Sequence, residues 1–130
     1  MSTGKSYVFE GFHEVTPYVY GGIEIVDFIK RVFGAEITHQ PEPDPSGQFH
    51  GEARIGDSRL MFGAGHFVDP SMKAAIWVYV PDVDLTHRAA VAAGASEVRR
   101  PEDQRWGDRV SGVRDKFGNT WWIATHKGTK

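Results

Sequence analysis

Aliphatic and aromatic residues alternate along two short segments of the chain, VTPYVY at 15–20 and AAIWVYV at 74–80. Adjacent side chains of a β-strand point to opposite faces of its sheet, so a period of two predicts a strand with two different faces. In both segments one face is aliphatic, and the other carries the rings of Tyr18, Tyr20, Trp77 and Tyr79. Both segments are therefore predicted strands with a ring-bearing face.

A helical pattern follows each of these segments. IEIVDFIKRVFG at 23–34 places apolar residues three and four positions apart and ends in a glycine, which favours a left-handed C-cap. PDVDLTHRAAVAAG at 81–94 offers Asp82 or Asp84 as N-cap, has an alanine-rich body and also ends in a glycine. Each predicted strand is thus followed by a predicted helix.

Three further strands are expected after each helix, at about 35–40, 48–55, 58–63, 95–100, 108–114 and 119–125. The dipeptides Gly56-Asp57 and Gly118-Asn119 favour a tight hairpin between the last two strands of each half. PEPDPSG at 41–47 and GAGHFVDPS at 63–71 are predicted loops because of their proline and glycine content.

The sequence itself repeats at an interval that matches this order. GAEITHQPE at 34–42 resembles GASEVRRPE at 94–102, IGDSRLM at 55–61 resembles FGNTWWI at 117–123, and PYVY at 17–20 resembles IWVY at 76–79. The predicted fold class is α+β, with two βαβββ modules that form a curved mixed sheet. We expect a single domain over 1–130, with module one at about 13–63, a linker at about 64–73 and module two at about 74–126.

The neighbouring residues Trp121 and Trp122 cannot both lie in one core. The repeat aligns Trp121 with Arg59 and Trp122 with Leu60, and helices are expected to cover the aliphatic face. We therefore expect Trp121 in the helix-covered core and Trp122 on the open face, beside Leu60 and Phe62. Arg59 at a core position would then need a carboxylate partner or a wetter edge.

Composition narrows the classes of function. The chain has 130 residues, a net charge of -2, a pI near 6.3 and no cysteine. Neither a basic patch for nucleic acid nor a thiolate or disulfide chemistry is expected. The first residues lack the apolar run of a signal peptide, and no stretch is long and apolar enough to span a bilayer. We expect a soluble cytoplasmic protein with no nucleic-acid or membrane partner.

A few polar residues are candidates for chemistry. His50 and Glu52 form an H-x-E pair that a strand would place on one face, and His126 falls on the Trp122 side of the last strand. Asp108 and Arg109 in WGDR at 106–109 either orient a polar ligand or form a structural pair, and the structural role is favoured. For His13, His39, His66 and His87 we expect loop or helix-surface positions without a functional role.

Four segments together resemble the vicinal oxygen chelate superfamily, the glyoxalase and bleomycin-resistance group, and within it the PhnB-like subgroup. They are VDFIKRVFGAE (26–36), FHGEARIGDSRLMFGA (49–64), VYVPDVD (78–84) and WGDRVSGVRDKFGNTWWIATH (106–126). The resemblance implies a cup-shaped sheet, and for the enzymes of the group it implies a divalent metal held by His, Glu or Gln from four strands. The matching positions here are Val15 or Thr16, Leu60, Ala74 or Ala75, and Trp122. None is a histidine or carboxylate, so no metal or other cofactor is expected.

The favoured hypothesis is a metal-free protein that sequesters a planar aromatic or apolar molecule, an antibiotic or natural product, as the bleomycin-resistance proteins do, and that forms a homodimer. An enzymatic role is not favoured. The expected ligand-binding residues are Tyr18, Leu60, Phe62, Trp77, Tyr79, Trp106, Trp122 and His126. Two alternatives stay open: a metal-dependent glyoxalase-like lyase or dioxygenase, and a structural or partner-binding dimer whose aromatic face is its interface.

Overall fold

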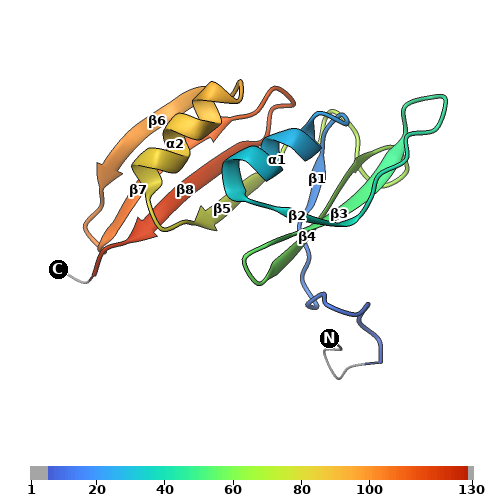
Figure 1. Cartoon of the computed structure of the whole chain (residues 1–130), viewed down its shortest axis with the longest axis horizontal. Helices are drawn as coiled ribbons and strands as arrows, with labels where there is room; N and C mark the ends of the chain where they lie inside the picture. The colour runs from blue at the N-terminus through green and yellow to red at the C-terminus, as the bar shows by residue number, and fades with distance from the viewer. Residues whose placement is uncertain (1–5, 129–130) are drawn as a thin grey trace.

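A computed structural model describes residues 6–128 of the chain, which form two four-stranded mixed sheets and two helices (Figure 1). The elements are β1 (Tyr18–Tyr20), α1 (Ile25–Phe33), β2 (Glu36–His39), β3 (Phe49–Ile55), β4 (Ser58–Ala64), β5 (Ala75–Tyr79), α2 (Val83–Ala92), β6 (Ser96–Asp103), β7 (Asp108–Arg114) and β8 (Thr120–His126). The predicted α+β class is confirmed, and so is the order strand, helix, strand, strand, strand in each half.

The two sheets have the same topology. The first sheet has the strand order β1-β4-β3-β2 and the second sheet the order β5-β8-β7-β6. In each, the first strand runs parallel to its neighbour, and the remaining pairs are antiparallel. A parallel pair needs a long crossover, which each helix and the strands after it provide. In the strand order, β1 and β5 each lie at one edge of their sheet.

The helices begin and end close to where the sequence pattern places them. Gly34 follows α1 with a left-handed φ of 65°, and its amide donates to the carbonyl of Lys30. At the start of α2 the side chain of Asp82 accepts a hydrogen bond from the amide of Leu85 at 3.2 Å. Of the two helices, which lie within residues 6–128, neither is long and apolar enough to cross a membrane.

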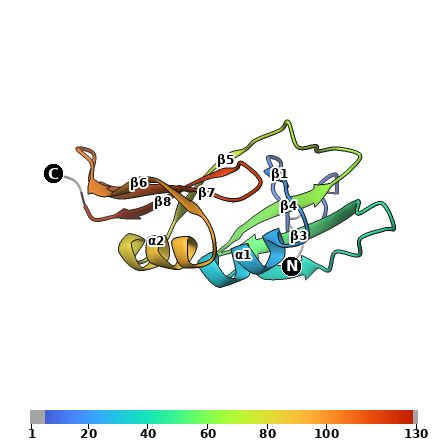
Figure 2. The ribbon, with the colours of Figure 1, turned by 90° about the horizontal axis from the view of Figure 1, so that it is seen from above.

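Trp121 lies at the centre of the core, as expected. Its side chain is fully buried. The rings of Phe28 and Phe33 in α1 lie 6.1 and 5.2 Å from its indole, and its Nε1 donates to Asp115 at 2.9 Å. Figure 2 shows α1 and α2 next to each other on one side of the second sheet. One face of that sheet is therefore covered by helices, and the opposite face carries none.

In the first sheet, the expected faces of β4 are wrong. Phe62 pairs with the buried Val19 and is itself fully buried, and Leu60 lies on the same side. Both belong to the core, and Arg59 does not. Its guanidinium carbon lies 5.0 Å above the ring of Phe12, in the segment that precedes β1. The contact is a cation–π interaction at the periphery of the core, so Arg59 needs no carboxylate.

The reason for the error is a difference in hairpin length. Ile55 pairs with Ser58, so Gly56 and Asp57 form the two-residue turn that the sequence predicts. Arg114 pairs with Thr120, which leaves five residues, 115–119, in the other connection. The expected tight turn at Gly118-Asn119 is therefore wrong. Because side chains alternate between faces, a one-residue error in aligning β4 with β8 reverses every assignment along β4.

Candidate functional site

The face of the second sheet opposite the helices gathers exposed aromatic side chains. We call Trp77, Tyr79, Trp106 and Trp122 the aromatic face. Trp77 and Trp122 lie on neighbouring strands at paired positions, and the rings of Trp77 and Tyr79 are 6.2 Å apart. Trp77 is 44% exposed, Tyr79 62% and Trp106 56%, although rings of this size usually bury most of their surface. This face is an apolar surface in contact with solvent.

Trp122 is the most enclosed member of the aromatic face because it lies against a glycine. Gly112 pairs with Trp122 across β7 and β8, and a Cβ atom at Gly112 would come within 2.6 Å of the indole. On β6 the guanidinium carbon of Arg99 lies 5.8 Å from the centre of the Trp122 ring system. The indole is thus held close to the backbone of the sheet and under a cation.

A single buried carboxylate, Asp108, holds three side chains of this face in place: Tyr79, Trp106 and His126. Asp108 is 1% exposed. It accepts hydrogen bonds from the hydroxyl of Tyr79 at 2.9 Å and from Nδ1 of His126 at 2.7 Å. Hydrogen bonds from Trp106 and His126, and then from Tyr79, lower the pKa of Asp108. The carboxylate therefore stays ionised and fixes the orientation of these rings before any ligand arrives.

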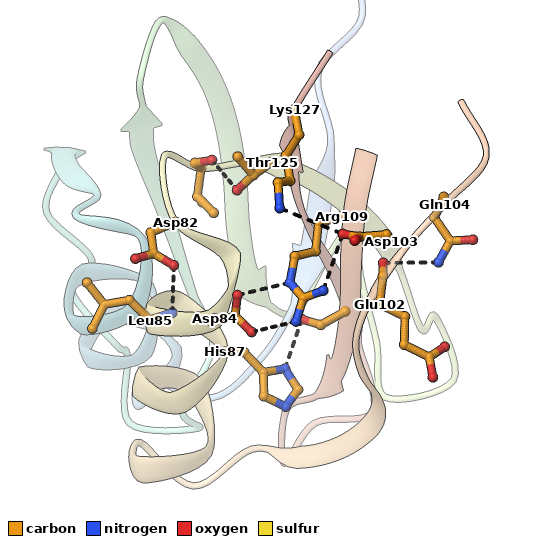
Figure 3. A network of polar contacts seen from close by, with 12 residues as sticks. Asp82, Asp84, Leu85, His87, Glu102, Asp103, Gln104, Arg109, Thr125 and Lys127 are labelled. Atoms are coloured by element: carbon orange, nitrogen blue, oxygen red, sulfur yellow. Dashed lines mark hydrogen bonds and ion pairs between the residues drawn. The ribbon is translucent and has the colours of Figure 1, made fainter. Parts of the chain in front are cut away.

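Arg109, the next residue, points to the other face and has a different role (Figure 3). Its guanidinium donates to both carboxylate oxygens of Asp84 in α2, at 3.0 and 3.1 Å, and to Asp103 at 3.2 Å. This two-point contact ties β7 to the helix. Asp108 and Arg109 therefore do not pair with each other: one organises the aromatic face, and the other connects the sheet to α2.

The H-x-E pair of the first sheet lies on one face of β3, as predicted. Nε2 of His50 lies 2.8 Å from Glu52, and Nδ1 of the same ring lies 2.9 Å from the hydroxyl of Tyr18. Glu52 and Tyr18 both flank Met61, on the face opposite Phe62. The three side chains form one hydrogen-bonded chain, Glu52–His50–Tyr18, on the open face of the first sheet.

The expected ligand-binding residues therefore fall into three places. Trp77, Tyr79, Trp122 and His126 come together on the second sheet, and Trp106, in the turn before β7, joins them through its hydrogen bond to Asp108. Tyr18 lies on the first sheet, and its only ring contacts among the described residues are to His50 and Phe67. Phe62 is fully buried in the core. Leu60 also packs in the core, but it borders a cavity of about 570 Å³ that Trp77 and Tyr79 line as well.

His87 is a buried polar residue that sequence reasoning missed. It was expected at a helix surface, but it is 5% exposed and contacts Ser111 at 2.8 Å and Glu97 at 2.7 Å. The signal was its spacing, because it falls on the same stripe of α2 as the buried residues Val83 and Ala90.

The side chains at the metal positions implied by the family resemblance do not fit a metal site. Those positions hold Val15 or Thr16, Leu60, Ala74 or Ala75, and Trp122. Leu60 lies in the core, and no member of the set is a histidine or a carboxylate. Over residues 6–128, no group of three or more His, Asp or Glu side chains could hold a metal ion.

Comparison with known proteins agrees with this architecture. The family model for the glyoxalase/bleomycin resistance protein/dioxygenase superfamily matches residues 20–123. An uncharacterized protein of Mycobacterium bovis is 33% identical over 108 residues, which cover 74% of this chain and 70% of that protein. An uncharacterized protein of Mycobacterium tuberculosis has the same identity, and the chain spans 63% of its length.

Two solved structures illustrate the similarity of fold. TioX from Micromonospora sp. ML1 superposes with a TM-score of 0.65 at 25% identity, over 91% of this chain and 99% of that one. A glyoxalase/bleomycin resistance protein/dioxygenase family enzyme from Burkholderia phytofirmans PsJN superposes with a TM-score of 0.63 at 18% identity, over 86% of this chain and 95% of that one.

Proposed function

Because the chain belongs to the glyoxalase/bleomycin resistance protein/dioxygenase superfamily, we propose that it is a binding member of that superfamily. Its function is to sequester a planar aromatic or apolar molecule, such as an antibiotic or a natural product, without a metal. Capture on the aromatic face is the whole mechanism. Within the superfamily we also propose the PhnB-like subgroup, on the basis of WGDRVSGVRDKFGNTWWIATH at 106–126.

The observation that carries this proposal is the exposed and pre-oriented aromatic face. Large rings left in water are energetically unfavourable, and a contiguous group of them marks a binding surface. Asp108 fixes Tyr79, and Gly112 lets Trp122 lie close to the sheet. Since these side chains are already ordered, a ligand loses little free energy in arranging them.

The chemistry of the face determines the class of ligand. Indole and phenol rings favour offset stacking on another planar ring, and each such contact contributes about 0.5–1.5 kcal/mol beyond the buried area. Several contacts of this size, together with apolar burial, are enough for a dissociation constant of roughly micromolar or lower. Apart from His126 and the guanidinium of Arg99 over Trp122, the face has few polar groups to select a small hydrophilic substrate.

The edge strands support a homodimer as the binding form. Among the described strands, β1 pairs only with β4, and β5 only with β8. The free edge of β5 lies beside Trp77 and Tyr79, which are on the same strand. An unpaired edge is a template for a strand from another chain, so a second copy that pairs there would also wall the aromatic face.

Titration calorimetry with bleomycin and with the anthracycline daunorubicin tests the proposal. We expect saturable binding of at least one of them. Trp77→Ala and Trp122→Ala should each weaken it about tenfold or more, since each removes a stacking partner and its buried area. Tyr7→Ala is the matched control, because it removes an exposed ring outside the aromatic face and should leave the affinity unchanged.

Two results would contradict the proposal. One is equal binding by wild type, Trp77→Ala and Trp122→Ala. The other is stoichiometric retention of Ni, Zn, Mn or Fe by the purified protein after incubation with each metal, which would favour a lyase or dioxygenase. A third outcome is that neither the wild type nor the variants bind either drug, and that both tryptophan variants become monomers. The aromatic face is then an interface between subunits.

A further inference from the structure

A second cavity, of about 280 Å³, opens on the first sheet, away from the aromatic face. Its lining includes Tyr18, Glu42, Asp44, Gln48, His50 and Phe67. The Glu52–His50–Tyr18 chain reaches this cavity through its last two members. The proposed function makes no use of this cavity. Along the hydrogen-bonded chain at its wall, donors and acceptors follow one another in a fixed order.

The direction follows from the donors and acceptors available. As a carboxylate, Glu52 can only accept, so when the imidazole carries a single N–H, that hydrogen lies on Nε2 of His50, 2.8 Å from Glu52. Nδ1 of His50 is then an acceptor, and the hydroxyl of Tyr18 must donate to it across 2.9 Å. The phenolic oxygen is left with lone pairs and no hydrogen to offer. Tyr18 therefore presents an acceptor to any ligand.

Burial and the charge of Glu52 both favour the Tyr18 oxygen as an acceptor. Desolvation and the nearby charge of Glu52 raise the pKa of Tyr18, so its hydroxyl keeps its proton and goes on donating to His50. Hydrogen bonds in a chain polarise one another, which makes the terminal oxygen a better acceptor. Glu52 is only 14% exposed, so water competes little for the carboxylate at the start of the chain.

The remaining lining favours a positive charge. The rings of Tyr18 and Phe67 lie 6.3 Å apart and form an aromatic corner of the cavity. Among the described residues that line it, Glu42 and Asp44 are acidic and none is lysine or arginine. Aromatic faces attract cations, and carboxylates attract them at longer range. An anion would meet an acceptor and two carboxylates, and no lysine or arginine; the basic side chains of the lining are His50 and His66.

We propose that this cavity binds the protonated amine end of a small molecule, with the Tyr18 oxygen accepting an N–H hydrogen bond and the rings of Tyr18 and Phe67 contacting the cation. The site is separate from the aromatic face and does not depend on the function proposed for that face. Its ligand class is a primary ammonium ion, because a quaternary ammonium has the charge but no N–H to donate.

Three probes of similar size separate charge from hydrogen bonding: benzylammonium, benzyltrimethylammonium and benzoate. By NMR titration of the wild-type protein we expect the tightest binding for benzylammonium, weaker binding for benzyltrimethylammonium and none for benzoate. Tyr18→Phe keeps the ring and removes the acceptor. It should weaken benzylammonium binding about tenfold or more and change benzyltrimethylammonium binding less than about twofold, because only the first probe donates a hydrogen bond.

Matched variants locate the site. Tyr20→Phe removes a hydroxyl from the same strand outside the cavity and should change neither affinity, and Trp122→Ala should also leave benzylammonium binding intact. Phe67→Ala should weaken both cations. The proposal is overturned if benzoate binds as tightly as benzylammonium, if Tyr18→Phe binds benzylammonium as the wild type does, or if Trp122→Ala abolishes that binding.

Discussion

Trp121 and Trp122 show how strongly the role of a residue depends on the face it occupies. Trp121 is fully buried, contacts two phenylalanines of α1 and donates to Asp115. Trp122 is half-buried and lies against Gly112. The first indole stabilises the fold, and the second is available to a ligand.

Replacing each tryptophan by alanine should separate these roles. Trp121→Ala leaves a large cavity and removes one of the two hydrogen bonds to Oδ2 of Asp115, and should lower the free energy of unfolding by about 3–5 kcal/mol. Trp122→Ala removes a partly solvated ring and should cost clearly less. Urea denaturation of both variants beside the wild type measures this, and equal losses would contradict the assignment of faces.

At the scale of elements, periodicity predicted most of the fold. β7 coincides with the expected 108–114, and Asp82 and Gly34 cap the helices as their residue types favour. These features depend on local sequence. The faces of β4 depend on the length of a connection, which is five residues after β7 because the side chain of Asp115 bonds the amides of Phe117 and Asn119. A repeat alignment cannot reveal such a difference.

The candidate site was predictable to a similar extent. Exposed rings on β5 and β8 followed from the alternation of residue types, because a strand places Trp77 and Trp122 on one face. The hydrogen bonds that orient them did not follow, since Asp108, Tyr79 and His126 come from three strands whose pairing the sequence does not contain. Of the Glu52–His50–Tyr18 chain, the sequence predicted only the H-x-E pair, and it did not connect Tyr18 with His50.

The contact between α2 and β7 makes stability depend on pH. The hydrogen bonds from Arg109, and its charge, lower the pKa of Asp84. A carboxyl group whose pKa is lower in the folded state stabilises the fold above its unfolded pKa, near 3.9, and loses that contribution as the pH falls through the folded value. Asp84→Asn should therefore be less stable than the wild type at pH 7, and the difference should vanish in acid.

Urea denaturation at a series of pH values from 7 down to 2 measures this difference. Asp27→Asn is the control, because Asp27 contacts Arg31 at 3.3 Å on an exposed surface of α1, where an ion pair contributes little. A gap between wild type and Asp84→Asn that stays constant over this range would show that the ionised carboxylate is not its source.

At the scale of the whole molecule, the two sheets are joined on their helix side and left with free edges. Asn119 is fully buried and connects the halves: it donates to the carbonyl of Tyr20 at 2.8 Å and accepts from the amide of Ala74 at 3.0 Å. The edge of β5 has no such partner within the described chain. The proposed dimer would occupy it.

Amide hydrogen exchange can detect that second copy. The carbonyl of Ala74 and the amide of Val80 bond to β8, so the amides of Ile76 and Val78 face β8 and those of Trp77 and Tyr79 face away. We expect exchange at Trp77 and Tyr79 to slow as the protein concentration rises, because a partner strand forms. Val78 should stay protected throughout. Fast exchange at Trp77 and Tyr79 at every concentration would rule out pairing along this edge.

The position of both helices on one side has an evolutionary consequence. Packing that keeps the protein folded is concentrated beneath the sheets, around Trp121 and Ile29, whereas Trp77, Trp106 and Tyr79 face outward. A substitution at Trp77, which does not contact the buried Asp108, changes what the surface recognises at little thermodynamic cost. A scaffold divided in this way can acquire new specificities over generations while its buried core stays unaltered.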